Sequence, residues 1–165
     1  MATKNDVDLE TDARSIITVR EFDAPRELVF SLFTDPKHLA QWFGPNGFTT
    51  TTSSFDMRPG GVWRFVMHGP DGRDYQNRVT YEEVVPPARI VYRHGGDNGG
   101  GDDVEPVQFT QTITFDDLGG KTRITWRHDF PSAADRDRVI KEYGAVEGVA
   151  QTLARLRDYV ATRIG

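Results

Sequence analysis

Cysteine is absent from this chain of 165 residues. Without thiols it cannot form disulfides, thiolate metal sites or a cysteine nucleophile. The chain also lacks any apolar run near the ~20 residues that a bilayer-spanning helix requires. We therefore predict neither a disulfide-stabilised secreted scaffold nor membrane insertion, and we expect a cytoplasmic protein.

Positive charge is also scarce, because 20 Lys and Arg face 25 Asp and Glu, which gives a net charge of -5. Nucleic-acid-binding domains usually carry a basic excess, so we do not expect a nucleic acid partner. The four histidines show neither the His-x-x-x-His nor the Glu-x-x-His spacing that is typical of metal sites. The sequence thus predicts no metal and no cofactor.

The length fits one domain, and a chain of this size can bury ~70% of its unfolded surface. Residues 1–14 are largely polar and contain no apolar signal core. We expect them to form a polar tail ahead of a single domain at residues 15–165.

Hydrophobic periodicity predicts the order of strands and helices. Residues 15–22 are rich in β-branched side chains and indicate a strand. Two short helices should follow, one with Asp23 as N-cap and Pro25 in its first turn, the other starting at Asp35-Pro36 and ending at Gly44-Pro45. Six further strands are predicted at residues 48–57, 62–69, 73–85, 89–94, 107–115 and 122–130. Short glycine- and proline-rich turns between them favour an antiparallel meander.

The C-terminal segment predicts one long helix of about eight turns, capped by Ser132 and apolar along one face. Gly144 and Gly148 lie inside it, so either the helix approaches the sheet closely there or it bends. Residues 95–106 contain five glycines and three aspartates, and we expect a mobile loop that gates a pocket.

Side chains alternate along the strands, so we expect one solvent-exposed, polar face of the sheet and one inner face rich in apolar and aromatic residues. One helix covers a width of ~10 Å, whereas a sheet of seven strands spaced ~4.8 Å apart is much wider. The sheet must therefore curl around the helix, and we expect a cavity between them. The predicted apolar walls of this cavity are Trp63, Phe65, Met67, Tyr75, Tyr92, Phe109 and Trp126. The predicted polar contacts are Asn77, Gln111 and His128, with His94 on the same face. The alternative is that these polar groups bond to the backbone or lie at exposed strand ends.

Several motifs together resemble the activator of heat-shock protein 90 ATPase-like branch of the START-like (SRPBCC) superfamily. These are Phe22-Asp23-Ala24-Pro25, Gln41-Trp42-Phe43-Gly44-Pro45, Arg58-Pro59-Gly60-Gly61-Val62-Trp63, Gly69-Pro70-Asp71-Gly72 and Pro86-Pro87-Ala88-Arg89-Ile90. The resemblance covers about residues 15–164 and implies an α+β helix-grip fold, as in birch-pollen allergen, with a deep pocket between sheet and long helix. It implies no shared catalytic residues. Where the branch usually has Gly-Trp in the last helix, this chain has Gly148-Val149, which should either widen the pocket or shift its floor.

The leading prediction is a binding protein for a small, hydrophobic, aromatic ligand, in a superfamily that includes lipid carriers. One alternative is a small cyclase, lyase or hydrolase in which His128 or a tyrosine transfers protons. Another is a co-chaperone-like interaction module that presents the corner at Trp42-Phe43-Gly44-Pro45. The sequence does not decide whether the chain forms a homodimer.

Overall fold

The computed structural model describes residues 13–95 and 108–163. Over these ranges the chain forms one antiparallel sheet with the strand order β1-β7-β6-β5-β4-β3-β2. The elements are, in chain order, β1 (Ser15–Phe22), α1 (Arg26–Ser31), α2 (Pro36–Trp42), β2 (Thr49–Phe55), β3 (Val62–His68), β4 (Asp74–Val85), β5 (Arg89–His94), β6 (Phe109–Asp117), β7 (Thr122–Asp129), α3 (Ala133–Tyr143) and α4 (Ala145–Arg163). The predicted α+β helix-grip fold is confirmed.

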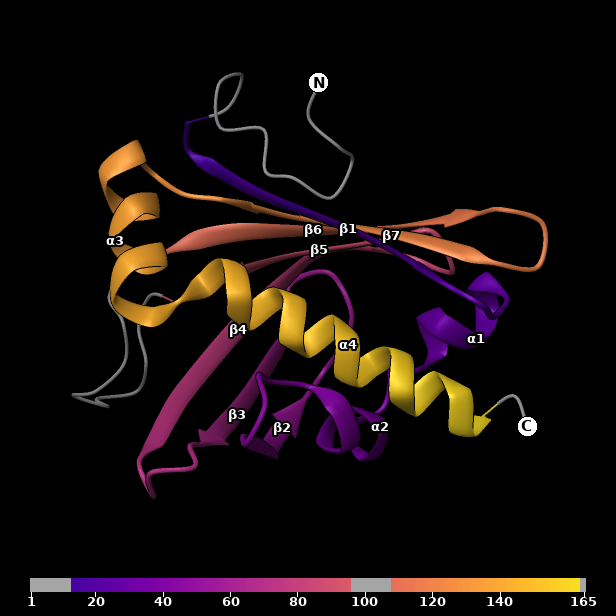
Figure 1. Cartoon of the computed structure of the whole chain (residues 1–165), viewed down its shortest axis with the longest axis horizontal. Coiled ribbons are helices and arrows are strands. Elements are labelled where there is room, and N and C mark those ends of the chain that lie inside the picture. The colour runs from indigo at the N-terminus through magenta and orange to yellow at the C-terminus, as the bar shows by residue number, and fades with distance from the viewer. Residues whose placement is uncertain (1–12, 96–107, 164–165) are drawn as a thin grey trace.

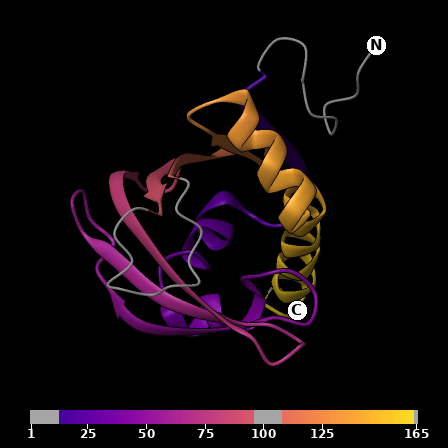
Figure 2. The same ribbon diagram turned by 90° about the vertical axis from the view of Figure 1, so that its left-hand side faces the viewer.

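The sheet is strongly curved, and α4 runs across its hollow side (Figure 1). Seen along the other direction, the strands bend around the interior while α3 and α4 close the open side (Figure 2). Register shifts between Thr52 and Ser54 and between Tyr81 and Glu83 interrupt two strand pairs. Such bulges increase local twist and help a sheet to bend.

Alternation along the strands is confirmed by burial. In β7, the inward side chains at positions 122, 124, 126 and 128 are buried, whereas the intervening ones are partly exposed. On the neighbouring strand Gln111, Ile113 and Phe115 are buried in the same way. The outer face carries ion pairs, which include Arg93 with Glu82, Arg123 with Glu21 and Arg127 with Asp129.

The interior contains two separate hydrophobic clusters. The larger one lies under α1, α2 and the C-terminal half of α4, where Leu153, Leu156 and Val160 are at most 3% exposed. The smaller one joins Ile16, Phe130 and Val139, with Phe109 packed against it. The seam between these clusters is where the polar residues of the inner face lie.

The predicted long C-terminal helix is present as α4, but the prediction that it runs without a break from Ser132 was wrong. The segment breaks at Gly144, whose φ of +61° lies in the left-handed region and ends α3. Of the two alternatives raised by the glycines, the bend is the one observed. Ser132 does cap α3, because its hydroxyl accepts a hydrogen bond from the Asp135 amide at 3.1 Å.

The prediction of Asp23 as N-cap of the first helix was also wrong. The cap residue of α1 is Pro25, which is extended and offers no side-chain acceptor. Asp35 caps α2 as predicted, since its carboxylate accepts from the Lys37 amide at 2.8 Å. The polar tail, apart from its last two residues, and nearly all of the predicted gating loop at residues 95–106 lie outside the described residues.

Candidate ligand-binding site

Four polar side chains of the inner face come from β4 to β7 and meet at the seam between the two clusters. The amide nitrogen of Gln111 lies 3.0 Å from Nδ1 of His94, and Nε2 of His94 lies 2.8 Å from the amide oxygen of Asn77. The Gln111 oxygen accepts from the Trp126 indole at 2.8 Å and from the Tyr92 hydroxyl at 3.3 Å. We call Asn77, His94, Gln111 and His128 the inner polar cluster.

Donor and acceptor chemistry fixes the direction of this chain of hydrogen bonds. An indole N–H can only donate, so the Gln111 oxygen faces Trp126 and its NH2 group faces His94. Nδ1 of His94 must then accept, and the ring proton sits on Nε2, where it donates to Asn77. The network is complete only with a neutral His94.

Burial lowers the pKa of His94 to about 4, which keeps the imidazole neutral near pH 7. The amide donor facing Nδ1 acts in the same direction, because a protonated ring would place two donors against each other. Burial also raises the pKa of Tyr92 well above its ordinary value, with a smaller contribution from Tyr81. The network therefore carries no charge near neutral pH.

His128 is the member of the cluster that stands apart from this network. It is the cross-strand partner of Gln111 and only 8% exposed. Its Nδ1 is buried and, among the residues that the structure describes, has no hydrogen-bond partner. Burial lowers the pKa of His128 to about 3, with a further contribution from His94, while a hydrogen bond between the imidazole and the backbone of Ile16 acts in the opposite direction.

Aromatic rings contact one another in a closed circuit that includes His94 and His128 of the cluster. The ring of Phe109 stacks on His94 at 5.0 Å between centroids, and Trp126 lies parallel to His128 at 5.9 Å. Contacts between neighbouring rings, all with centroids within 6.4 Å, run through Phe65, His94, Phe109, His128, Trp126 and Phe43 and back to Phe65. We call these six residues the aromatic circuit. It gives the seam a rim of flat, largely apolar faces.

Most of the residues predicted to line a pocket lie together here. Trp63 stacks on Phe65 at 3.9 Å and donates to Thr52, and Met67 packs against the larger cluster. Tyr75 lies elsewhere, because its ring contacts Phe48 and the guanidinium of Arg73. Phe43 was not among the predicted pocket residues, because the sequence analysis placed it at the end of a short helix and in the corner offered to a protein partner. The signal in the sequence was the following Gly44-Pro45, which favours a turn, and Gly44 has a φ of +115°.

Burial along α4 changes between its two halves. The C-terminal half is packed, whereas the apolar residues Val146, Val149 and Ala150 in the N-terminal half are only partly buried. His94, Asn77 and Phe109, on the facing strands, are also partly buried. Asn77 and His94, like the N-terminal half of α4, are thus less completely buried than the centre of the larger hydrophobic cluster.

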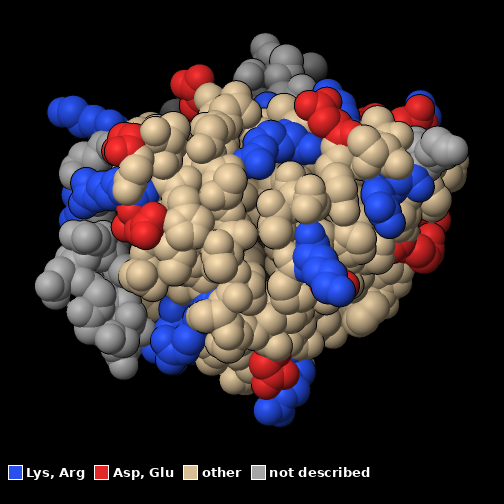
Figure 3. Space-filling model, turned by 90° about the horizontal axis from the view of Figure 1, so that it is seen from below, with Lys and Arg blue, Asp and Glu red and all other residues tan. Residues whose placement is uncertain are grey.

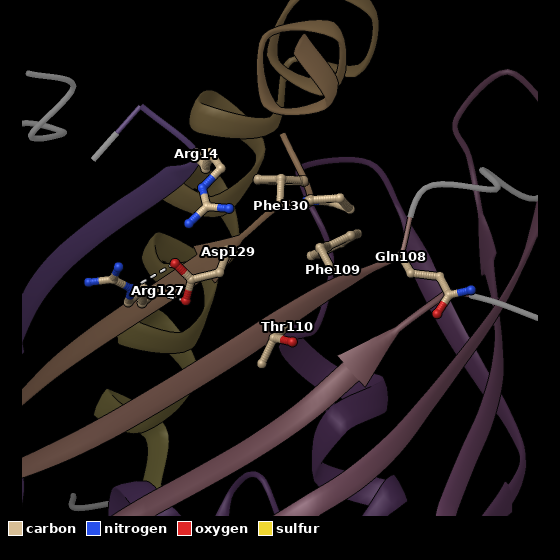
Figure 4. A pocket seen from close by; sticks show the side chains of 8 residues that line it. Arg14, Gln108, Phe109, Thr110, Arg127, Asp129 and Phe130 are labelled. Atoms are coloured by element: carbon tan, nitrogen blue, oxygen red, sulfur yellow. Dashed lines mark hydrogen bonds and ion pairs between the residues drawn. The ribbon is translucent and has the colours of Figure 1, made fainter. Parts of the chain in front are cut away.

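A pocket of about 360 Å³ lies at the ends of β6 and β7 (Figure 4). Its lining is Arg14, Gln108, Phe109, Thr110, Arg127, Asp129, Phe130 and Pro131. Arg127 donates from Nε to both carboxylate oxygens of Asp129 at 2.9 Å, so these charges compensate each other. Thr110, Arg127 and Asp129 occupy outward positions of their strands, so this pocket is distinct from the inner polar cluster.

Acidic and basic side chains are interspersed over the face seen in Figure 3, without a broad area of one sign. Within residues 13–95 and 108–163, His, Asp and Glu form no group of three or more that could hold a metal ion. Over the same residues, no helix is long and apolar enough to cross a bilayer.

The chain was compared with known protein families and with curated proteins. The profile of the family described as "Activator of Hsp90 ATPase homolog 1-like protein" matches residues 23–161. The chain belongs to this family. The predicted resemblance to that branch of the START-like superfamily is therefore confirmed. Among curated proteins no match was found.

Several solved structures are similar to this chain in fold. A solution structure from Arthrobacter aurescens has a TM-score of 0.83 and 26% identity, covering 94% of this chain and 90% of that one. A crystal structure from Mycobacterium smegmatis has a TM-score of 0.81 and 26% identity, covering 99% and 98%. A third, from Chromobacterium violaceum, has 0.75 and 28%, covering 89% and 96%. A fold of this family indicates a ligand-binding or interaction module.

Proposed function

We propose that the protein binds a small, hydrophobic, aromatic molecule between the sheet and the N-terminal half of α4. The observation that carries this proposal is the aromatic circuit, which joins His94 and His128 of the inner polar cluster to four apolar rings. Ligand sites of this kind combine apolar walls with a few convergent polar groups. Phe43, His94 and Phe109 are only partly buried, so their flat rings are suited to stacking against a ligand.

Partial burial of both walls supports the same proposal. A fully packed core would leave residues such as Phe109 and Val149 below a few per cent exposure, as it does for Leu153 and Leu156. Instead the two apolar clusters are separated where α4 is least buried. Valine at position 149 also occupies less volume than the tryptophan that the family resemblance leads us to expect there.

Proton-transfer chemistry is less well supported by the geometry. A general base works best when its pKa lies near the working pH, and burial lowers the pKa of His128 to about 3. His94 already uses both ring nitrogens in hydrogen bonds. The arrangement favours binding over acid–base catalysis.

Presentation of the Trp42 corner to a protein partner is not favoured either. Trp42 is 0% exposed, and its indole donates to the Leu32 carbonyl at 3.1 Å. The ring stacks edge-on against Phe33 inside the larger cluster. This side chain anchors α2 in the core and offers no exposed indole to a partner.

The proposal is tested with a neutral apolar dye, N-phenyl-1-naphthylamine, whose fluorescence rises and shifts to the blue in an apolar site. We expect saturable binding by the wild type. Val149→Trp should fill the space beside the cluster and weaken dye binding at least about tenfold, because it removes room for the ligand's apolar surface. The matched control is Ala154→Trp, which places the same side chain at an exposed position of α4.

A second pair of variants tests the facing wall. Phe109→Asp puts a charge among apolar faces and should abolish dye binding, whereas Leu118→Asp, at a residue 36% exposed on the β6–β7 turn, should not. Circular dichroism verifies that each variant is folded. Dye binding that is equal in wild type, Val149→Trp and Phe109→Asp would show that the site lies elsewhere.

A further inference from the structure

One polar atom in the inner polar cluster lacks the partner that its neighbours have. Asn77, His94 and Gln111 satisfy one another, together with the backbone carbonyl of Tyr75, to which the Asn77 amide donates at 3.0 Å. Nδ1 of His128 is buried beside them and has no partner in the described part of the chain. Buried polar atoms in folded proteins are rarely left so, and an incoming group that bonds to one gains the full benefit of satisfying it.

The surroundings of His128 restrict what such a group can be attached to. The imidazole lies parallel to Trp126, with an interplanar angle of 10°, and is tilted by 31° from Phe109. A ligand that reaches this ring therefore passes between aromatic faces, where a flat apolar body makes the most contact.

The absence of charged side chains from the inner polar cluster and the aromatic circuit restricts the charge that a ligand can carry. These two groups of residues consist of amides, imidazoles, an indole and phenyl rings, so they offer no charged partner to an ion. Arg136 of α3 donates from Nε to the carbonyl of Ser15, next to the cross-strand partner of His128. This cation is already paired with Asp137. Arg155 of α4 is also occupied, because it donates to the carbonyls of Gly44, Pro45 and Phe48 at 2.9, 3.0 and 3.1 Å. A carboxylate or an ammonium group would lose its hydration at the seam without compensation.

Building on the proposed function, we propose that the ligand is an uncharged aromatic molecule whose hydroxyl group hydrogen-bonds to Nδ1 of His128. A hydroxyl group both donates and accepts, so it fits either tautomer of the neutral ring. The interior of this protein accordingly selects phenols and aromatic alcohols over fatty or aromatic acids and over amines that are charged at neutral pH.

Three probes of nearly equal shape test the selection by calorimetric titration at pH 7. These are naphthalene, 2-naphthol and 2-naphthoate, which differ in carrying no polar group, a neutral hydroxyl or a carboxylate. We expect 2-naphthol to bind about tenfold more tightly than naphthalene, the gain of one satisfied buried hydrogen bond. The carboxylate should bind more weakly than naphthalene.

His128→Phe keeps a flat ring but removes both nitrogens, so it should erase the preference for 2-naphthol while naphthalene still binds. The control is His68→Phe, because His68 sits at the far end of β3, paired with Asp74 and partly exposed. A readout independent of affinity is the ¹⁵N resonance of Nδ1 of His128, which should shift when 2-naphthol binds and not when naphthalene binds.

The outcomes separate this inference from the proposed function. If naphthalene and 2-naphthol bind equally well and the Nδ1 resonance does not move, the role of His128 is refuted, although a site for aromatic ligands stands. Tight binding of 2-naphthoate would refute the selection for uncharged ligands. If neither neutral probe binds to the wild type, the proposed function fails and this inference fails with it. The wild-type titrations decide these points even if His128→Phe does not fold.

Discussion

Gln111 is the residue on which the inner hydrogen bonds converge, and replacing it by leucine tests the network directly. Leucine has similar length but no polar atoms. In Gln111→Leu the Trp126 indole and Nδ1 of His94 lose the partners now at 2.8 and 3.0 Å, and the Tyr92 hydroxyl loses its longer contact. Gln111 is only 4% exposed, so water does not readily replace these bonds.

A buried polar group without a partner destabilises a protein by about 1–3 kcal/mol. Two groups lose a good hydrogen bond here, and the added apolar surface offsets part of that loss. We therefore expect Gln111→Leu to lower the free energy of unfolding by about 2–4 kcal/mol. In a protein of this size that corresponds to a fall in Tm of about 5–15 °C. The matched control is Gln108→Leu, at an exposed position just before β6, which should change stability by less than about 0.5 kcal/mol.

A double-mutant cycle separates the hydrogen bonds from simple changes in volume. Trp126→Phe removes the indole donor, so Gln111→Leu should cost about 1–2 kcal/mol less in that background. Urea unfolding, followed by far-ultraviolet circular dichroism, measures all four proteins. Strict additivity, within about 0.5 kcal/mol, would mean that the bond from Trp126 to Gln111 contributes nothing and would refute the network as described.

Two further predictions concern pH and the break between α3 and α4. The pKa values of His94 and His128 are lowered on folding from 6.5 to about 4 and about 3, so the unfolded chain binds more protons between these limits. Stability should therefore be complete above pH 6.5 and fall by about 3–4 kcal/mol between pH 7 and 5, with each histidine contributing about half. Urea unfolding of wild type and His128→Phe at both pH values checks this, and an equal slope in both would contradict it. Gly144→Ala should destabilise by about 1 kcal/mol because of its φ of +61°, whereas Gly148→Ala, whose added Cβ would lie 3.6 Å from Pro45, should stabilise by about 0.5–1 kcal/mol. The same denaturant titration compares the two, and effects of one sign would contradict the assignment of the helix break.

The strands and the two faces of the sheet could be predicted from sequence because period-two alternation is a local pattern. Trp126 and His128 alternate with Thr125 and Arg127 in the printed sequence, and burial follows that order. The break at Gly144 could not be decided in the same way. Glycine inside a helical pattern is compatible with a bend and with close packing, and the choice depends on what α3 and α4 each pack against.

The hydrogen-bond partners within the inner polar cluster were harder still to predict from the sequence. Alternation along the strands placed Asn77, His94, Gln111 and His128 on one face of the sheet. Which of these side chains hydrogen-bond to one another depends on the register of four strands. His94 is directly opposite Val79 and Phe109, so its bond to Asn77 is diagonal. Such contacts depend on sheet twist and rotamer choice, which no local pattern encodes.

The same register explains why one histidine is satisfied and the other is not. Gln111 stands between Tyr92 on β5 and His128 on β7, and its side chain has only one oxygen and one NH2 group. The indole of Trp126 takes the oxygen and thereby turns the NH2 group toward His94. His128 is directly opposite Gln111, but it receives no hydrogen bond from that amide. The unpaired nitrogen thus follows from donor and acceptor counting around one glutamine, and exchange of Trp126 for a residue without an N–H would free the amide to turn toward His128.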